Sequence, residues 1–199
     1  MFGLKKDIPV KKIVCVLLCS YGILLHTLTA AAPPEVFEKM PVERPDLQAK
    51  LLRAVIKFST RQLDQITVGI VYVHEAEKIA QKFADEFEKL TYNKQPIKVV
   101  FIQSEQLDSF DELVNILYVT PGNAAFLDTI FDIAAQKKIF SCSGIPEYVR
   151  NEKIALGFDE YKGKPQIVLN LIVAKTTDHD FKNPKFLNLQ MTHKLVLIK

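Results

Sequence analysis

Four short apolar runs alternate with segments of helical periodicity, and this alternation limits the fold more than any other feature of the chain. The runs are rich in Val and Ile, as buried strands are. They are ITVGIVYVH (66–74), IKVVFIQ (97–103), NILYVT (115–120) and KIFSCS (138–143). Because helical crossovers join parallel strands, we expect a single three-layer α/β domain, with a mainly parallel sheet and helices on both of its faces.

The segments between the runs carry one apolar face each. In residues 75–90 the apolar side chains recur at helical spacing: Ala76, Ile79, Ala80, Phe83, Phe87 and Leu90. Asp46 is placed to cap the first helix, and Asn123 is placed to cap a helix whose inner face is Leu127, Ile130, Phe131 and Ala134. Ser109 and Glu112 have capping-box spacing, which predicts a short helix before the third strand.

The pattern changes after Gly144. Residues 153–161 and 166–170 flank the turn residues Lys162-Gly163-Lys164-Pro165, and a turn that short joins antiparallel strands. An antiparallel hairpin is therefore expected at one edge of the sheet. Residues 183–197 are expected to form a last helix followed by a short apolar tail, with a core of Phe186, Leu187, Leu189 and Met191.

Asn170 interrupts a run that is otherwise apolar. Its side chain can accept a hydrogen bond from a backbone N–H two or three residues on, which is the N-cap arrangement. We predict that the strand ends at Asn170 and that a helix begins at Leu171. The alternative is one strand through Val173, because Val and Ile mildly disfavour helices.

Residues 1–31 have the pattern of a secretory signal peptide. Four lysines precede the uncharged apolar residues 13–28, and small residues follow. An uncleaved anchor is the alternative, although the apolar run is shorter than the ~20 residues that span a bilayer. A lipoprotein signal fits less well, because Leu18 precedes Cys19 where a small residue is normal. We expect cleavage, then a proline-rich linker or extended arm (32–45) and a domain over 46–199.

Removal of the leader changes the charge and the cysteine content. Residues 1–32 hold four lysines and one aspartate, so 22 of the 26 basic and 22 of the 23 acidic residues remain. This neutral balance leaves no electrostatic footprint for nucleic acid. Only Cys142 remains of the three cysteines, which excludes an internal disulfide. The rest of the chain is long enough to build one core without it.

Four strings resemble parts of the YfiR-like domain of exported bacterial proteins. They are QAKLLRAVIKFS (48–59), NILYV (115–119), IFSCSGIPEYV (139–149) and GKPQIVLNLIVAK (163–175), within a resemblance that covers residues 46–197. The resemblance implies a periplasmic domain without enzymatic activity. It further implies regulation of a membrane-bound signalling protein, a diguanylate cyclase or a sensor kinase, and hence of cyclic-di-GMP signalling.

Two features depart from that family. Its best-known member uses paired cysteines, whereas Cys142 is alone here, which argues against redox tuning. The family often has a glycine pair before the hairpin, where this chain has Arg150-Asn151-Glu152-Lys153.

Few residues suggest catalysis or metal binding. Asp178-His179-Asp180 offers suitable ligand types, but consecutive residues rarely all face one ion, so we expect a solvated loop. Ser141 and Cys142 end a strand, yet a nucleophile needs a base in reach, and no histidine of the chain has motif spacing. Neither a G-x-S-x-G elbow nor a Gly-rich phosphate loop occurs. The sequence therefore predicts no enzyme, no metal and no cofactor.

A small-molecule site, if the domain has one, belongs at the carboxyl ends of the parallel strands. The polar residues expected there are His74, Gln103, Ser104, Thr120, Asn123, Ser141 and Ser143. The alternative is that these residues form ordinary turns and caps.

The leading hypothesis is thus an exported regulatory or interaction domain that binds a membrane partner. A periplasmic solute-binding or uptake accessory protein is the second hypothesis, although a two-lobed binder needs more chain. A hydrolase is the third, and the missing nucleophile–base motif disfavours it. The sequence leaves open a small ligand and a homodimer.

Overall fold

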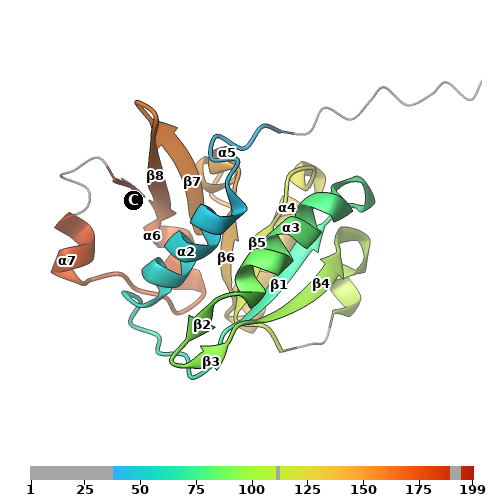
Figure 1. The fold of residues 1–199 in the computed structure, drawn as a ribbon, viewed down its shortest axis with the longest axis horizontal. Coiled ribbons are helices and arrows are strands. Elements are labelled where there is room, and N and C mark those ends of the chain that lie inside the picture. Colours follow the sequence, from blue (N-terminus) through green and yellow to red (C-terminus); the bar gives the residue numbers. More distant parts are fainter. Residues whose placement is uncertain (1–37, 111–112, 189–193) are drawn as a thin grey trace, which may run out of the picture. The chain divides into compact units, whose positions relative to one another are not determined.

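A seven-stranded sheet organises the domain in the computed structural model, which describes residues 38–110, 113–188 and 194–199 (Figure 1). The strand order is β4-β1-β5-β6-β7-β8-β9. The strands are β1 (Thr67–Tyr72), β4 (Lys98–Gln103), β5 (Ile116–Val119), β6 (Phe140–Ser143), β7 (Leu156–Tyr161), β8 (Lys164–Asn170) and β9 (Leu195–Ile198). The first five strands in this order run parallel, which confirms the predicted α/β class.

Helices connect these strands and cover both faces of the sheet. They are α2 (Pro45–Ile56), α3 (Glu77–Glu88), α4 (Leu127–Lys137), α5 (Pro146–Arg150), α6 (Leu171–Thr176) and α7 (Pro184–Leu187), with the 3-10 turns η1 (His74–Ala76), η2 (Ser104–Ser109) and η3 (Ala124–Phe126). A small second ribbon, β2 (Thr91–Tyr92) with β3 (Gln95–Pro96), follows α3. The described elements all belong to one compact unit, Phe37–Lys199.

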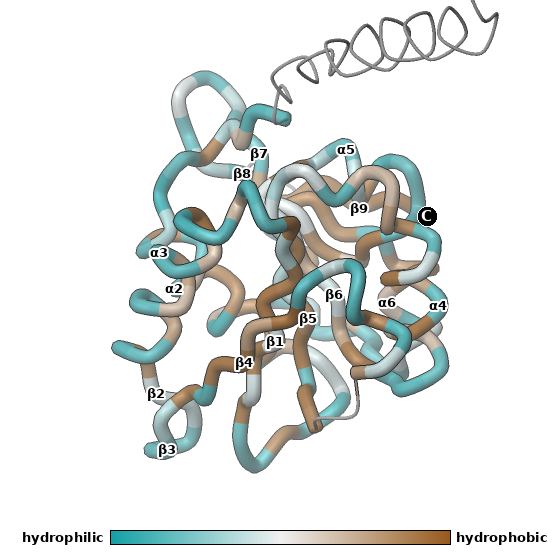
Figure 2. The backbone as a smooth tube through the Cα atoms, turned by 90° about the vertical axis from the view of Figure 1, so that its right-hand side faces the viewer, coloured by the Kyte–Doolittle hydropathy of each residue, from teal (hydrophilic) through white to brown (hydrophobic). Residues whose placement is uncertain are grey.

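The core has two parts, one on each side of the sheet. Alternation along β5 divides them: Ile116 and Tyr118 pack with α2 and α3, while Leu117 and Val119 pack with α4 and α5. Figure 2 shows the result, with hydrophobic strands β1 and β5 in the interior and hydrophilic residues along α2 and α3. A central strand with both faces covered has this continuous apolar composition for that reason.

The predicted hairpin is present, and β7 pairs antiparallel with β8. Lys162 and Gly163 both have positive φ (51° and 73°), which a tight two-residue turn requires. The hairpin lies one strand in from the edge, because β9 pairs with β8 and runs parallel to it. The last helix was predicted over residues 183–197 with a short apolar tail: α7 is present but only four residues long, and the apolar end of the chain is a strand that begins at Leu195. Residues 189–193 lie outside the described residues.

Asn170 is the predicted helix cap. Its Oδ1 accepts hydrogen bonds from the N–H groups of Ile172 (3.0 Å) and Val173 (3.1 Å), and α6 begins at Leu171. The side chain is fully buried, so the helix N-terminus supplies the partners that a buried amide needs. This confirms the strand-to-helix junction.

Three other predicted caps are wrong. The first helix begins at Pro45, whose missing N–H suits the first helical position, so Asp46 lies inside the first turn. Asn123 precedes η3 without a side-chain cap, because its amide turns into the protein. The Ser109 hydroxyl donates to the carbonyl of Gln106 at the end of η2 and does not begin a helix. Its predicted partner Glu112 lies outside the described residues.

Candidate functional site

The connections from β1 to β4 and from β4 to β5 run in opposite directions along the sheet, and this creates a switch point at the carboxyl ends of β1 and β5. The chain passes from β1 to β4 on one side and then to β5 on the other side. In doubly wound sheets the crevice at such a point is where ligands bind. The candidate site is therefore the region beyond Tyr72 and Val119.

Three of the predicted site residues meet there in one buried network. The Thr120 hydroxyl donates to the carbonyl of Val71 (3.0 Å), and the Asn123 Nδ2 donates to the carbonyl of Thr120 (2.9 Å). The Ser104 hydroxyl donates to the Asn123 Oδ1. Each of the three side chains is at most 3% exposed. The network ties the ends of β1, β4 and β5 together, so these polar groups already hold partners inside the protein.

The remaining predicted residues do not join this network. The Ser143 hydroxyl donates to the carbonyl of Val119 (2.8 Å) and accepts from the N–H of Ile145 (3.0 Å), which fixes the turn into α5. The Ser141 hydroxyl accepts from the N–H of Ala155 (3.0 Å). His74 is exposed and Gln103 is half-buried at the ends of their strands. A role for any of these residues in ligand binding stays a prediction.

A carboxylate of the chain itself lies at the switch point. Glu38 accepts a hydrogen bond from the N–H of Gly122 (2.8 Å) through one oxygen and from the Tyr148 hydroxyl (2.9 Å) through the other. Gly122 follows Pro121 in a turn and has φ of 88°, a conformation that glycine adopts without strain. Tyr148 comes from α5, so the turn after β5 and the helix after β6 together hold the carboxylate.

Residues 38–42, which we call the arm, pack beside this contact. Glu38, Met40 and Val42 are turned toward the domain, whereas Lys39 is exposed. The Gln48 Nε2 donates to the carbonyl of Val42 (2.6 Å). A Cβ at Gly144 would lie 2.6 Å from the Met40 sulfur, so the absent side chain leaves the space that Met40 fills. The sequence left open whether residues 32–45 are a linker or an extended arm. Their described part packs on the domain and is therefore an arm.

The electrostatics of the contact follow from burial. Desolvation raises the pKa of the Tyr148 hydroxyl, and its hydrogen bond to the Glu38 carboxylate raises that pKa further. Tyr148 therefore stays a neutral donor at physiological pH. Among the described residues, no lysine or arginine pairs with Glu38, so two neutral donors hold its charge.

The other candidates for chemistry are separated or enclosed. Burial raises the pKa of the Cys142 thiol well above its ordinary value, which opposes a nucleophilic role. In the loop 178–180, Asp178 pairs with Lys138 and Asp180 with Lys182, while His179 is buried. Within residues 38–110, 113–188 and 194–199, no group of three His, Cys, Asp or Glu side chains is arranged to hold a metal ion.

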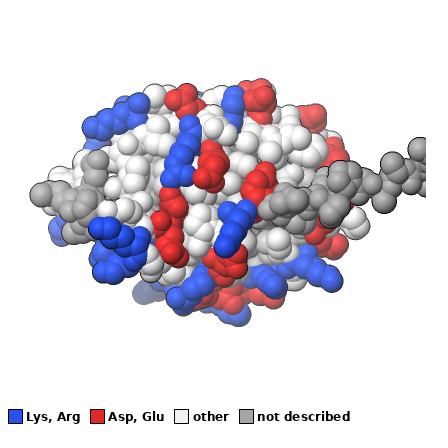
Figure 3. All heavy atoms as spheres, turned by 90° about the horizontal axis from the view of Figure 1, so that it is seen from above, with Lys and Arg blue, Asp and Glu red and all other residues white. Residues whose placement is uncertain are grey.

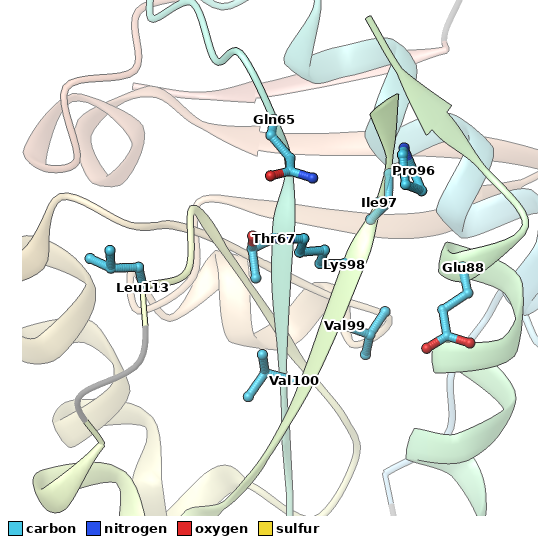
Figure 4. A pocket seen from close by; sticks show the side chains of 9 residues that line it. All are labelled: Gln65, Thr67, Glu88, Pro96, Ile97, Lys98, Val99, Val100 and Leu113. Carbon is cyan, nitrogen blue, oxygen red and sulfur yellow. The ribbon is translucent and has the colours of Figure 1, made fainter. Parts of the chain in front are cut away.

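An open groove of about 700 Å³ lies at the outer edge of the sheet, beside β4. Its lining comes from both sides of that edge, with Glu88 on α3 and Leu113 on the opposite side (Figure 4). Leu113 is 94% exposed. Because these side chains surround a strand edge and do not converge on one point, the groove lacks the set of converging polar groups that fixes a small ligand.

Sequence reasoning missed three side chains that meet around this contact, those of Glu38, Gln48 and Tyr148, and the space that Gly144 leaves for Met40. A local signal for the arm exists in the alternation of Glu38, Met40 and Val42, which places three side chains on one side of a non-helical segment. The residues that bind Glu38 carry no local signal, because they are distant in the sequence. Gly122 is the nearer of the two and is 84 residues away.

The chain matches no family model, and no curated protein is significantly similar to it. In the part of the chain that the structure describes, no helix is long and apolar enough to cross a membrane. On the face that Figure 3 shows, basic and acidic side chains are interspersed and neither sign forms a continuous area.

Proposed function

We propose that this protein is an exported, non-enzymatic interaction domain that binds and regulates a membrane-bound signalling protein from the periplasm. The partner class is a diguanylate cyclase or a sensor kinase, as the resemblance to YfiR-like domains implies. Export rests on the leader pattern of residues 1–31.

One observation carries the proposal: the arm fills the place where a wound sheet of this order would bind a small molecule. Thr120 and Asn123 are hydrogen-bonded to each other and to the carbonyl of Val71. A solute at this place would first have to displace Glu38 from Gly122 and Tyr148. This arrangement favours a surface that recognises a protein over a pocket that captures a solute.

The state of the candidate nucleophiles also supports a non-enzymatic role. Ser141 uses its hydroxyl to hold the N–H of Ala155, and the Cys142 thiol is buried with a raised pKa. Neither residue has a histidine as a hydrogen-bond partner among the described residues. A hydrolase needs the nucleophile and its base within reach of each other.

Site-specific photocrosslinking in intact cells tests the proposal. The photoreactive residue replaces Lys39, which is exposed in the arm, in the full chain. Lys185 is the matched control, because it is also an exposed lysine but lies on α7. We expect crosslinking at position 39, and not at 185, to a membrane protein that carries a diguanylate cyclase or kinase domain.

Two results would overturn the proposal. One is capture at position 39 of nothing beyond the chain itself. The other is a chain that keeps residues 1–31 and resists an external protease in cells with a permeabilised outer membrane. A small molecule that raises Tm by several degrees would favour solute binding instead, because a ligand of the native state stabilises it.

A further inference from the structure

We propose that the surface under the arm, which Gln48, Gly122, Gly144 and Tyr148 form and which we call the arm groove or simply the groove, is a recognition site for an acidic segment of the partner protein, and that the arm is an internal substitute that the partner displaces. The inference rests on the proposed function, because it names where the partner binds and what chemistry it presents. The segment has the arm's own pattern: a carboxylate, any residue, an apolar residue, proline and a second apolar residue.

Four separate groups of the groove contact that pattern. The N–H of Gly122 and the hydroxyl of Tyr148 bind the carboxylate. The bare backbone of Gly144 gives room to the first apolar side chain. The amide of Gln48 donates to the backbone carbonyl of the second apolar residue, Val42. These groups lie on α2, on α5 and in the turns after β5 and β6, so fixed elements of the fold build the groove.

One contact of the groove is made to the backbone of the arm, and this makes exchange of the arm for another segment feasible. A hydrogen bond to a backbone carbonyl does not depend on which side chain follows. Of the five arm residues only Lys39 is exposed, while Glu38, Met40 and Pro41 are half-buried and Val42 is buried. The chain bends at Pro41 and Val42, and proline limits the conformations that such a segment adopts before it binds.

The hold on the arm is of moderate strength. A carboxylate bound by two neutral donors lacks the added attraction of a cation, and Glu38 is only half-buried. The groups that remain after the arm leaves, however, include a backbone N–H and a tyrosine hydroxyl that need an acceptor. A carboxylate of the partner would accept both hydrogen bonds again, so displacement of the arm replaces each lost bond with an equivalent one.

Peptide binding in trans, measured by ¹H–¹⁵N NMR on the full chain, tests the inference. The probe is the blocked peptide EKMPVER, residues 38–44 of the chain. The receiving protein carries Glu38→Ala and Met40→Ala, which remove two anchors of the arm and leave the groove intact. The reporter is the Gly122 amide signal, which belongs to one of only seven glycines.

We expect the peptide to shift the Gly122 signal of this variant back toward its wild-type position. The wild-type chain should not respond, because its own arm acts at an effective concentration in the millimolar range. The peptide QKMPVER should bind at least fivefold more weakly, as should the native peptide when Tyr148→Phe is added to the variant. Cooperative unfolding of each variant is the control for folding.

Three results would overturn the inference. They are no shift of Gly122 in a folded double variant, equal binding of the two peptides, and a wild-type dimer in which the Glu38 of one copy contacts the Gly122 of the other. The last result would assign the groove to a second copy of this chain. The proposed function has a separate test: crosslinking at position 39 can succeed while the peptide fails, which would mean that the partner binds next to the arm without displacing it.

Discussion

The hydroxyl of Tyr118 donates a hydrogen bond to the Gln48 Oε1 at 2.7 Å, and both side chains are fully buried. Tyr118 belongs to the central strand β5 and Gln48 to the first helix. The other end of the Gln48 amide donates to Val42 in the arm. One buried amide therefore links the middle of the sheet to the segment that fills the switch point.

Tyr118→Phe should lower the free energy of unfolding by about 1–3 kcal/mol, because it leaves the buried Gln48 oxygen without a donor. Gln48→Leu should cost a similar amount or more, since Tyr118 and Val42 both lose a partner. The double variant should lose less than the sum of the two, because both ends of the broken bond are then gone. Urea denaturation measures all three, and strict additivity would contradict the coupling.

Glu38 and Tyr148 should be energetically coupled. In a double-mutant cycle of Glu38→Ala and Tyr148→Phe we expect a coupling free energy of about 1 kcal/mol, since the bond is charge-assisted but only half-buried. Equilibrium denaturation of the four proteins gives this value. A coupling indistinguishable from zero would mean that the arm is not held at the switch point in solution.

Asn170→Ala should destabilise the domain by about 1–2 kcal/mol, because α6 loses a fully buried acceptor for two backbone N–H groups. Asn183 provides the matched control: it caps α7 by accepting from the N–H of Lys185 (2.9 Å), but it is exposed. Asn183→Ala should cost clearly less, since water replaces the lost bond. Equal losses in urea denaturation would contradict the importance of burial at the strand-to-helix junction.

His179 should make stability depend on pH. Burial lowers its pKa from 6.5 to about 4, with the Arg61 charge adding to the shift and the Asp178 charge opposing it. Nδ1 lies 2.8 Å from the carbonyl of Thr177, so Nδ1 carries the proton. Nε2 lacks a partner, alone among the buried side-chain nitrogens and oxygens of the described residues.

The folded state thus holds His179 neutral, while the unfolded chain protonates it below pH 6.5. Above pH 6.5 His179 is neutral in both states, so it costs no stability. As the pH falls from 6.5 toward 4, only the unfolded chain gains the proton, and the free energy of unfolding falls by up to about 3 kcal/mol. We expect the unfolding free energy of the wild type to fall by about that much more than that of His179→Gln between pH 7 and 4. Parallel pH profiles of the two proteins would contradict a buried neutral histidine.

The order of the elements was predictable because the signals for it are local. Strand runs such as 66–74 and the apolar stripe of α3 are patterns of period two or 3.6 within a few residues. The Asn170 cap was predictable for the same reason, since donor and acceptor lie two and three residues apart. The cap predicted at Asn123 was wrong because its amide is bonded within the buried network, where Nδ2 donates to Thr120 and Oδ1 accepts from Ser104.

The last strand and the candidate site depended on contacts that no local pattern records. The apolar residues that begin at Leu195 form a strand because the β8 edge is open and offers them unpaired backbone groups.

By itself, the sequence determined the sheet class, the hairpin and the strand-to-helix junction, because each follows from the periodicity or the hydrogen-bonding reach of adjacent residues. Only the tertiary structure decided that Glu38 meets Gly122, 84 residues away, and Tyr148, 110 residues away. The strand order brings the turn after β5 and the helix after β6 to the same end of the sheet, and the arm reaches them there only once the sheet is assembled.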